Sequence, residues 1–268
     1  PMIAMGSIGV DANANFIKKH CHKSSIETKF LKSTNKAPTS HTVCMFEKQN
    51  ERTFLYYAGA NNLLDVNHFQ IKKLKSIPKI LYVGYITLLG KLDKFSGKNT
   101  RLCEILIQAK KKKIITVLDL VSNNDPSFQK VVVSALPHTD YLLLNEIEAE
   151  LLFKQSVTDS KKNLDKKIII HLSKKIFLKG INKALIIHHS KESLYISRDE
   201  IIHTKAKAID KKKIINSVGA GDAFCAAFIF GVHESWEMKE ILKKAHAAGN
   251  AMVKVDASSG NLPKINKL

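Results

Sequence analysis

A turn of small residues that runs directly into a carboxylate is the stretch of this sequence with the clearest chemistry. Gly219-Ala-Gly221 leads into Asp222 and then into residues 223–230, which are apolar on every face. An apolar segment of this kind is typical of a buried helix, and the first amides of a helix lack intrahelical partners and carry partial positive charge. Because glycine has no Cβ, a phosphate could approach these amides closely.

Asp222 would then lie where a base can take a proton from a hydroxyl beside a phosphoryl group. The pattern therefore predicts phosphoryl transfer to an alcohol. The alternative interpretation is an ordinary turn capped by an acidic residue, which four residues alone would favour. The buried helix that follows gives the two interpretations equal weight.

Alternating strands and helices surround this turn and decide where it lies. The pattern predicts strands over residues 79–84, 114–120, 141–144 and 184–188, and helices over 100–112, over 126–136 and from about 146. This alternation indicates the α/β class, with a parallel sheet covered by helices on both sides. Ligands bind beyond the carboxyl ends of such strands. Asp119, Asn145, His188 and the Gly219 turn all fall at such ends, so we expect them at one edge of the sheet.

The first 60 residues follow a different pattern. We expect a strand over residues 3–9 and a helix capped by Asp11 that runs to about His22. Three short segments rich in β-forming residues follow, over residues 26–31, 41–47 and 52–57, and residues 48–51 read as a hairpin turn. A small sheet within about residues 24–60 is expected to stand off from the main body.

Composition narrows the class of protein. The chain has 268 residues, of which 44% are hydrophobic and 25% charged, as in an ordinary globular protein. No apolar stretch is long enough to span a bilayer, so no membrane partner is expected. Its 4 cysteines form no Cys-x-x-Cys pair, which suits a cytoplasmic protein and argues against a zinc ribbon or a disulfide framework.

The formal net charge of +19 raises the question of nucleic-acid binding. The lysines stand in short clusters along the whole chain, and aromatic residues do not alternate with them as in a nucleic-acid surface. Solvated lysine-rich faces are the preferred interpretation, and no specific nucleic-acid partner is expected. Attraction of an anionic nucleotide would be a by-product of this charge.

Three stretches resemble the ribokinase-like (PfkB) carbohydrate kinase family. Residues 218–224 resemble the C-terminal signature of the family, and residues 140–149 contain its Asn145-x-x-Glu148 element. The third stretch, Glu51-Arg-Thr-Phe followed by Ala58-Gly-Ala-Asn61, resembles the end of the family's lid sheet. The similarity extends to Asn261-Leu-Pro263. The resemblance implies a single domain over residues 1–268, a three-layer sandwich with a mostly parallel central sheet and a small β lid.

The resemblance also implies a function, in which a phosphoryl group passes from ATP to a hydroxymethyl group of a sugar or nucleoside. The implied residues are Asp222 as base, the amides of Gly219, Ala220 and Gly221 as anion hole, Asn145, His188, Ser190 and Asn250 for the nucleotide, Glu148 and Asn145 for Mg²⁺ through water, and Gly84, Asn61 and Asp222 for the substrate. Tyr85 is expected to border the substrate pocket. Asn145 is also predicted to be a helix N-cap that forms a capping box with Glu148, and a structural role for His188 stays open. A homodimer through the β lid is the expected assembly.

The chain departs from the family pattern in three places. Asn216 and Ser217 stand where the family usually has aspartate and threonine, and Ser190 and Ser193 stand at the glycine positions of its Thr-x-Gly-x-x-Gly turn. The sequence also begins at what resembles the family's second strand and contains no Gly-Gly pair, which reads as a shortened homologue or a fragment. These departures motivate a second hypothesis, a catalytically impaired protein that still binds nucleotide. The choice among pentoses, hexoses and nucleosides stays open.

Overall fold

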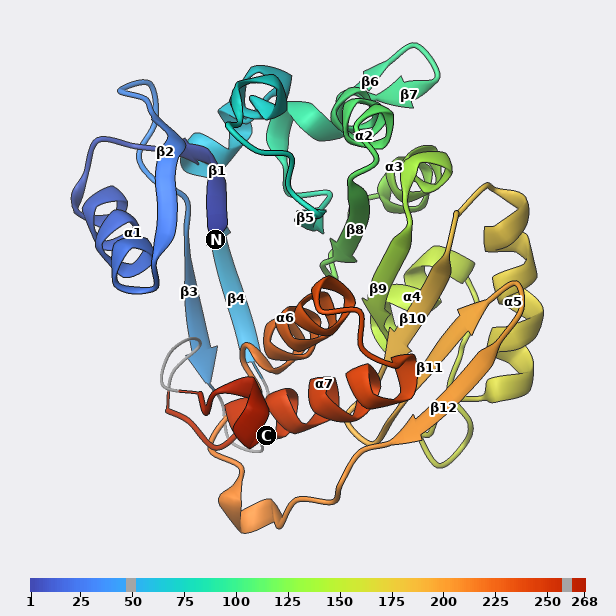
Figure 1. Ribbon diagram of the computed structural model, residues 1–268. Coiled ribbons are helices and arrows are strands. Elements are labelled where there is room, and N and C mark those ends of the chain that lie inside the picture. Colours follow the sequence, from blue (N-terminus) through green and yellow to red (C-terminus); the bar gives the residue numbers. More distant parts are fainter. Residues whose placement is uncertain (47–51, 257–261) are drawn as a thin grey trace.

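A six-stranded sheet, in the order β12-β11-β10-β9-β8-β5, forms the centre of the computed structural model (Figure 1). The structure describes residues 1–46, 52–256 and 262–268, so the hairpin turn predicted at 48–51, Glu51 and Asn261 lie outside the described residues. The strands are β5 (Ile80–Ile86), β8 (Ile115–Leu120), β9 (Tyr141–Asn145), β10 (Ala184–His188), β11 (Glu192–Ser197) and β12 (Ile201–Lys205). Strands β5, β8, β9 and β10 pair in parallel, whereas β11 pairs antiparallel with both β10 and β12, which confirms the mostly parallel sheet.

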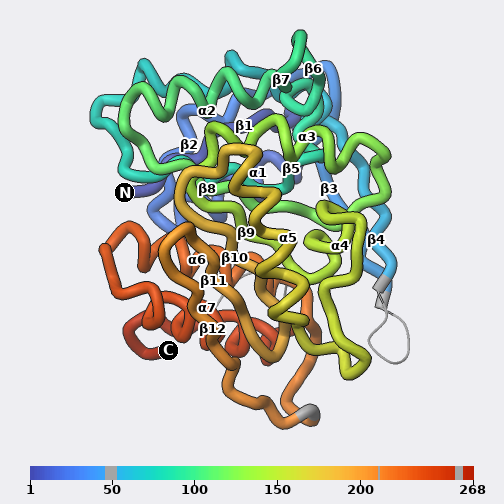
Figure 2. The backbone as a smooth tube through the Cα atoms, turned by 90° about the vertical axis from the view of Figure 1, so that its right-hand side faces the viewer, coloured from blue at the N-terminus to red at the C-terminus, as the bar shows by residue number. Residues whose placement is uncertain are grey.

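Helices cover both faces of this sheet, as the strand–helix alternation predicts. They are α2 (Arg101–Lys111), α3 (Phe128–Ala135), α4 (Glu146–Phe153) and α5 (Lys166–Leu178) on one face, and α6 (Ala220–His233) and α7 (Met238–Met252) on the other (Figure 1). Figure 2 shows the chain turned by 90°, with the hairpin of β6 (Phe95–Ser96) and β7 (Asn99–Thr100) at one end and α7 towards the other.

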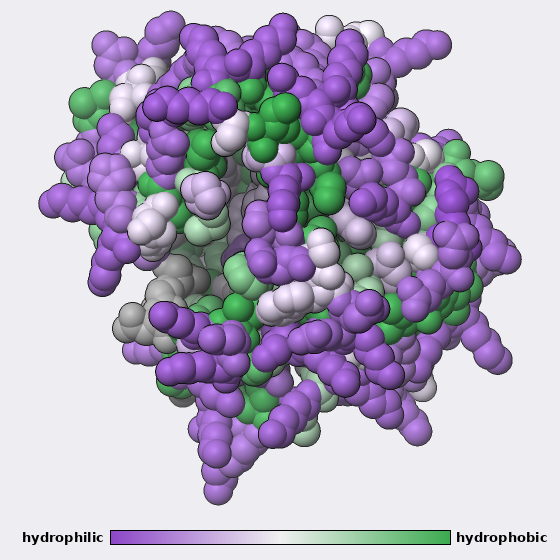
Figure 3. Space-filling model, in the orientation of Figure 1, coloured by the Kyte–Doolittle hydropathy of each residue, from purple (hydrophilic) through white to green (hydrophobic). Residues whose placement is uncertain are grey.

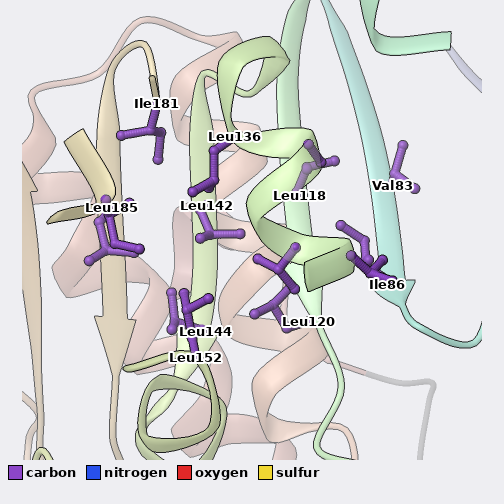
Figure 4. Close-up of a cluster of buried hydrophobic side chains, with 14 of the residues drawn as sticks. Val83, Ile86, Leu118, Leu120, Leu136, Leu142, Leu144, Leu152, Ile181 and Leu185 are labelled. Atoms are coloured by element: carbon purple, nitrogen blue, oxygen red, sulfur yellow. The ribbon is translucent and has the colours of Figure 1, made fainter. Parts of the chain in front are cut away.

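Side-chain alternation along the strands divides the core into two layers. Leu142 and Leu144 of β9 belong to the cluster under α2 to α5, which Figure 4 shows. Tyr141 and Leu143 point the other way and pack in the cluster under α6 and α7. Because both faces of β9 are covered, the strand is apolar throughout, and each fully buried leucine stabilises the fold by roughly 1.5–3 kcal/mol.

The amino-terminal region forms two small sheets. Strand β1 (Met2–Ile8) and strand β2 (Ile26–Ser33) are parallel and joined by α1 (Ala12–Lys23), whereas β3 (His41–Phe46) and β4 (Arg52–Tyr57) form an antiparallel hairpin. The hairpin lies within the range expected for the lid, residues 24–60. Strand β2 does not join it, because the α1 crossover brings β2 back alongside β1.

Asp11 connects these two parts. Its carboxylate caps α1 by accepting a hydrogen bond from the amide of Ala14, as predicted, and it also accepts bonds from the amide and hydroxyl of Thr39, just before β3. These hydrogen bonds hold the pKa of Asp11 below its usual value. In the described part of the chain, no helix combines the length and apolarity needed to cross a membrane.

Candidate active site

The amino end of α6 presents backbone amides at the carboxyl edge of the sheet. Gly219 precedes the helix with φ 78°, a left-handed conformation that favours glycine. Within the described chain no side chain caps this end, and the Ala220 amide makes only a long hydrogen bond of 3.4 Å to the Ser217 carbonyl oxygen, so this turn can still offer amides to an anion. Asp222 is the third residue of the helix and its side chain is exposed. Helix α7 lies close by, since a Cβ at Gly249 would be 3.2 Å from the Ala220 carbonyl oxygen.

Asn216 shapes the approach to this turn. Its Oδ1 accepts a hydrogen bond from the amide of Val218 at 2.9 Å, and its Nδ2 donates one to the carbonyl oxygen of Val255 at 2.9 Å. The side chain is buried. An aspartate could make the first bond but not the second, because an ionised carboxylate has no proton to donate. Asn216 therefore makes a contact with Val255 that an ionised aspartate at this position could not make.

Asn145 and Glu148 form the capping box that the sequence predicts at the start of α4. The Glu148 amide donates to Asn145 Oδ1 at 2.9 Å, and the Asn145 amide donates to Glu148 Oε2 at 2.8 Å. Asn145 Nδ2 and the Ser122 hydroxyl both donate to Glu148 Oε1. Burial is the largest influence on Glu148 and raises the pKa of its carboxyl, against these hydrogen bonds. Since both its oxygens already accept hydrogen bonds, Glu148 suits contact with a metal through water.

Asp119, at the carboxyl end of β8, is near enough to Glu148 and Asp222 for both charges to act on it. It is only 5% exposed and accepts a hydrogen bond from the Tyr82 hydroxyl at 3.0 Å. Burial first, and then the charge of Glu148, raises the pKa of Asp119 to about 7, and the Asp222 charge acts in the same direction. In the described residues, no group of three histidine, cysteine or acidic side chains is placed to bind a metal directly.

Asp222 itself contacts the last part of β5. The Tyr85 hydroxyl donates a hydrogen bond to Asp222 Oδ1 at 2.6 Å. Partial burial, followed by the Asp222 charge, raises the pKa of the Tyr85 phenol, so it stays protonated and acts as the donor. The face of the molecule seen in Figure 3 is hollowed between the part formed by β4 and the part formed by β5 and α6. Thr87, two residues after Tyr85, lines a cavity of 630 Å³ together with Tyr56 of β4 and Asp125.

His188 lies against the same helix end. Its ring stacks on Phe224 with centroids 4.8 Å apart and an interplanar angle of 25°, and a Cβ at Gly221 would be 3.6 Å from its Cε1. Burial lowers the pKa of His188 to about 4, so the ring is neutral. Ser190 is exposed in the turn that follows. Ser193 is buried instead, and its hydroxyl contacts His246 Nε2 at 3.0 Å.

The other predicted residues have contacts in the frame of the site. Asn61 Nδ2 donates to the hydroxyls of Ser40 and Tyr56, both at 3.2 Å, which ties it to the lid. Asn250 Nδ2 donates to the Lys207 carbonyl at 2.8 Å. A Cβ at Gly84 would be 2.9 Å from the Tyr82 hydroxyl, so glycine there gives that phenol its path to Asp119.

The structure thus brings the Gly219 turn, Asp222 and His188 together, and the charges of both Glu148 and Asp222 act on Asp119. Sequence reasoning placed Asp119 at this edge but gave it no role, and it did not assign Tyr82. It expected Tyr85 near the substrate but did not predict its bond to Asp222. The sequence signal that could have pointed to these two tyrosines is their position on either side of Gly84 at the end of a predicted strand.

Comparison with known proteins defines the class. The model of the pfkB family of carbohydrate kinases matches residues 2–265, and the chain belongs to this family. It is therefore a carbohydrate kinase with the ribokinase-like fold.

Individual relatives are distant. A 5-dehydro-2-deoxygluconokinase of Clostridium botulinum (strain Alaska E43 / Type E3) is 24% identical over 98% of this chain and 76% of its own length, and a ribokinase of Dictyostelium discoideum is 22% identical over 97% and 79%. Among solved structures, adenosine kinase from Schistosoma mansoni in complex with 2-fluoroadenosine matches with a TM-score of 0.80 at 20% identity, covering 99% of this chain and 76% of the other. Ribokinase of Arabidopsis thaliana complexed with ribose and ATP matches with a TM-score of 0.77 at 20% identity, over 99% and 80%. These likenesses show the fold.

Proposed function

We propose that this kinase transfers the terminal phosphoryl group of ATP to a hydroxymethyl group of a sugar or nucleoside, with Asp222 as general base. The acceptor oxygen forms a bond to phosphorus, the bond to the ADP oxygen breaks, and the hydroxyl proton passes to the Asp222 carboxylate. The amides of Gly219, Ala220 and Gly221 stabilise the charge of the transferring group. The observation that carries this proposal is the uncapped end of α6 with Asp222 in its first turn.

The nucleotide and Mg²⁺ are assigned to the strand ends beside this turn. Glu148 and Asn145 would hold Mg²⁺ through water, because their direct hydrogen bonds are made with each other and with Ser122. When bound, the ion would supply positive charge against the phosphate oxygens. His188, Ser190 and Asn250 are assigned to the nucleotide side, and Asn61 and Gly84 to the acceptor side. The whole of residues 1–268 acts as one kinase domain, with the β3–β4 hairpin as its lid.

The test of the base is Asp222→Asn, which keeps the shape of the side chain and removes its basicity. Turnover of a panel of sugars and nucleosides should fall at least about 100-fold, while calorimetry shows ATP binding retained. The matched control is Asp199→Asn, an exposed carboxylate in the turn between β11 and β12, which should leave turnover unchanged. Normal turnover by the Asp222→Asn protein would show that the base is another group.

A second candidate is a nucleotide-binding protein with impaired catalysis. It is favoured by Ser193, which stands at a family glycine position and uses its hydroxyl inside the fold, on His246. Calorimetry that shows ATP binding, combined with no ATP consumption across the same panel, would select this candidate. Steady ATP consumption with any sugar or nucleoside would exclude it.

We further propose that two copies associate through the outer face of the β3–β4 hairpin. Val43 and Leu55 lie opposite each other there and are 52% and 56% exposed, beside the exposed Met45 and Tyr57. Burying these side chains against a second copy would remove an apolar face from water. Light scattering should find a dimer for the natural protein and a monomer for Leu55→Asp. Thr42→Asp, on the other face of the same hairpin, should stay dimeric, and a natural protein that is monomeric at all concentrations would contradict the proposal.

A further inference from the structure

The hydrogen bond between Tyr85 and Asp222 joins two elements that are distant in sequence. It is 2.6 Å long, and Tyr85 is its donor because the pKa of the phenol is raised. Only Oδ1 of the carboxylate takes part in it. A short bond to an ionised acceptor is among the stronger hydrogen bonds in proteins, so this contact fixes the orientation of Asp222.

An irregularity in β5 aims Tyr85 at this carboxylate. Val83 pairs with Leu118 and Ile86 with Leu120, so the stretch of β5 between the two pairs is one residue longer than that of β8. Bulges of this kind turn a side chain out of the regular alternation and are frequent beside active sites. Tyr85 lies in the extra stretch and has φ +59°.

This backbone conformation is unfavourable for tyrosine. A positive φ is uncommon for residues other than glycine and is a genuine outlier for a bulky side chain. Thr87, two residues on, has φ +84° and accepts a hydrogen bond from Asn123 Nδ2. Strained residues persist where the surroundings hold them, and they concentrate at functional sites. Here the Asp222 carboxylate is what holds the Tyr85 side chain.

We propose that Tyr85 is a positioning residue for phosphoryl transfer, which anchors Asp222 through Oδ1 and leaves Oδ2 for the acceptor hydroxyl. The inference rests on the proposed function of Asp222 as base. General bases are commonly oriented by a third group that does not touch the reacting atoms. An unanchored carboxylate would rotate about its side-chain bonds and spend less time aligned with the acceptor, which lowers the rate of the chemical step and leaves substrate binding intact.

The experiment is the variant Tyr85→Phe, which removes the hydroxyl and keeps the ring. The value of kcat should fall about 10- to 100-fold, while KM for ATP and for the acceptor changes by less than about twofold. Tyr141→Phe is the matched control. Tyr141 begins β9, at the opposite end of the strands, and packs on Phe228, so loss of its hydroxyl should leave kcat unchanged.

A double-mutant cycle separates positioning from packing. If Tyr85 acts through Asp222, then Tyr85→Phe should have no further effect on the residual single-turnover rate of Asp222→Asn. A fall of the same size with and without the carboxylate would overturn the proposal, as would an unchanged kcat in Tyr85→Phe. If the proposal that Asp222 is the general base is wrong, the Asp222→Asn protein will be as active as the natural protein, which distinguishes that outcome from a failure of the role of Tyr85 alone. If Asp222→Asn is inactive and Tyr85→Phe is fully active, only the role of Tyr85 fails.

Discussion

Asp119 is a carboxyl group whose protonation depends strongly on the fold around it. Its pKa is about 7, raised mainly by burial, whereas the same group in the unfolded chain titrates near its ordinary value of 3.8. Between these two values the folded protein holds a proton that the unfolded chain has released. The contribution of Asp119 to the free energy of unfolding is therefore fully present below about pH 4 and is lost as the pH rises through 7.

The variant Asp119→Asn should remove this dependence. It keeps an acceptor for Tyr82 and carries no charge, so its stability advantage over the natural protein should widen by roughly 2–3 kcal/mol between pH 5 and pH 8. Denaturant unfolding at both pH values measures the difference. Asp125→Asn is the control, because hydrogen bonds from Ser127 lower the pKa of Asp125 and keep it ionised at both values. A gap that stays constant for Asp119→Asn would show that its carboxyl titrates normally.

The hydrogen bond from Asn216 to Val255 yields a second prediction at the residue scale. Asn216→Asp would place a carboxylate oxygen against the Val255 carbonyl oxygen, which now accepts a hydrogen bond from the Asn216 amide. A buried pair of acceptors costs about 1–3 kcal/mol. Chemical unfolding at pH 8 should show this loss in the free energy of unfolding. The control Asn35→Asp should show no loss, because Asn35 is exposed. Equal or higher stability of Asn216→Asp would mean that the contact with Val255 is dispensable.

Among the elements, the pair α6 and α7 holds the candidate site in place through close packing. A Cβ at Gly231 of α6 would lie 2.6 Å from Ile241 Cγ1 of α7, too close for any real contact. Gly231→Ala should therefore push the helices apart and lower the free energy of unfolding by about 1–3 kcal/mol. Gly6→Ala in β1 is the matched control, because a Cβ there meets Leu31 at an ordinary 3.5 Å. Equal unfolding midpoints for the two variants would contradict this packing argument.

The regular elements follow from sequence patterns, whereas the contacts at their ends do not. Alternation and apolar runs predict β8, β9, β10 and their helices, and the spacing of Asn145 and Glu148 predicts the capping box. The irregular end of β5 escapes such reasoning, because a bulge shifts side chains without changing the hydrophobic pattern. The bond from Tyr85 to Asp222 spans 137 positions and depends on the finished tertiary structure.

At the scale of the whole molecule, the net charge of +19 sets the field that an anionic ligand meets. Most lysine side chains lie on the surface, as in the run Lys110–Lys113 at the end of α2, where they are exposed or half-buried. Such a field raises the local concentration of a nucleotide without specifying it, and it acts equally on any polyanion.

Salt separates this general attraction from specific recognition. Because the Debye length shrinks from about 10 Å at 0.1 M salt to about 3 Å at 1 M, KM for ATP should rise about 3- to 10-fold between 50 and 500 mM KCl. KM for a neutral sugar should stay constant over the same range and is the internal control. Duplex DNA should bind weakly and without sequence preference at 150 mM salt, where counterion release contributes less. Tight, sequence-dependent DNA binding under those conditions would mean that the lysines form a nucleic-acid surface. A KM for ATP that does not change with salt would mean that local contacts at the α6 turn alone attract the nucleotide.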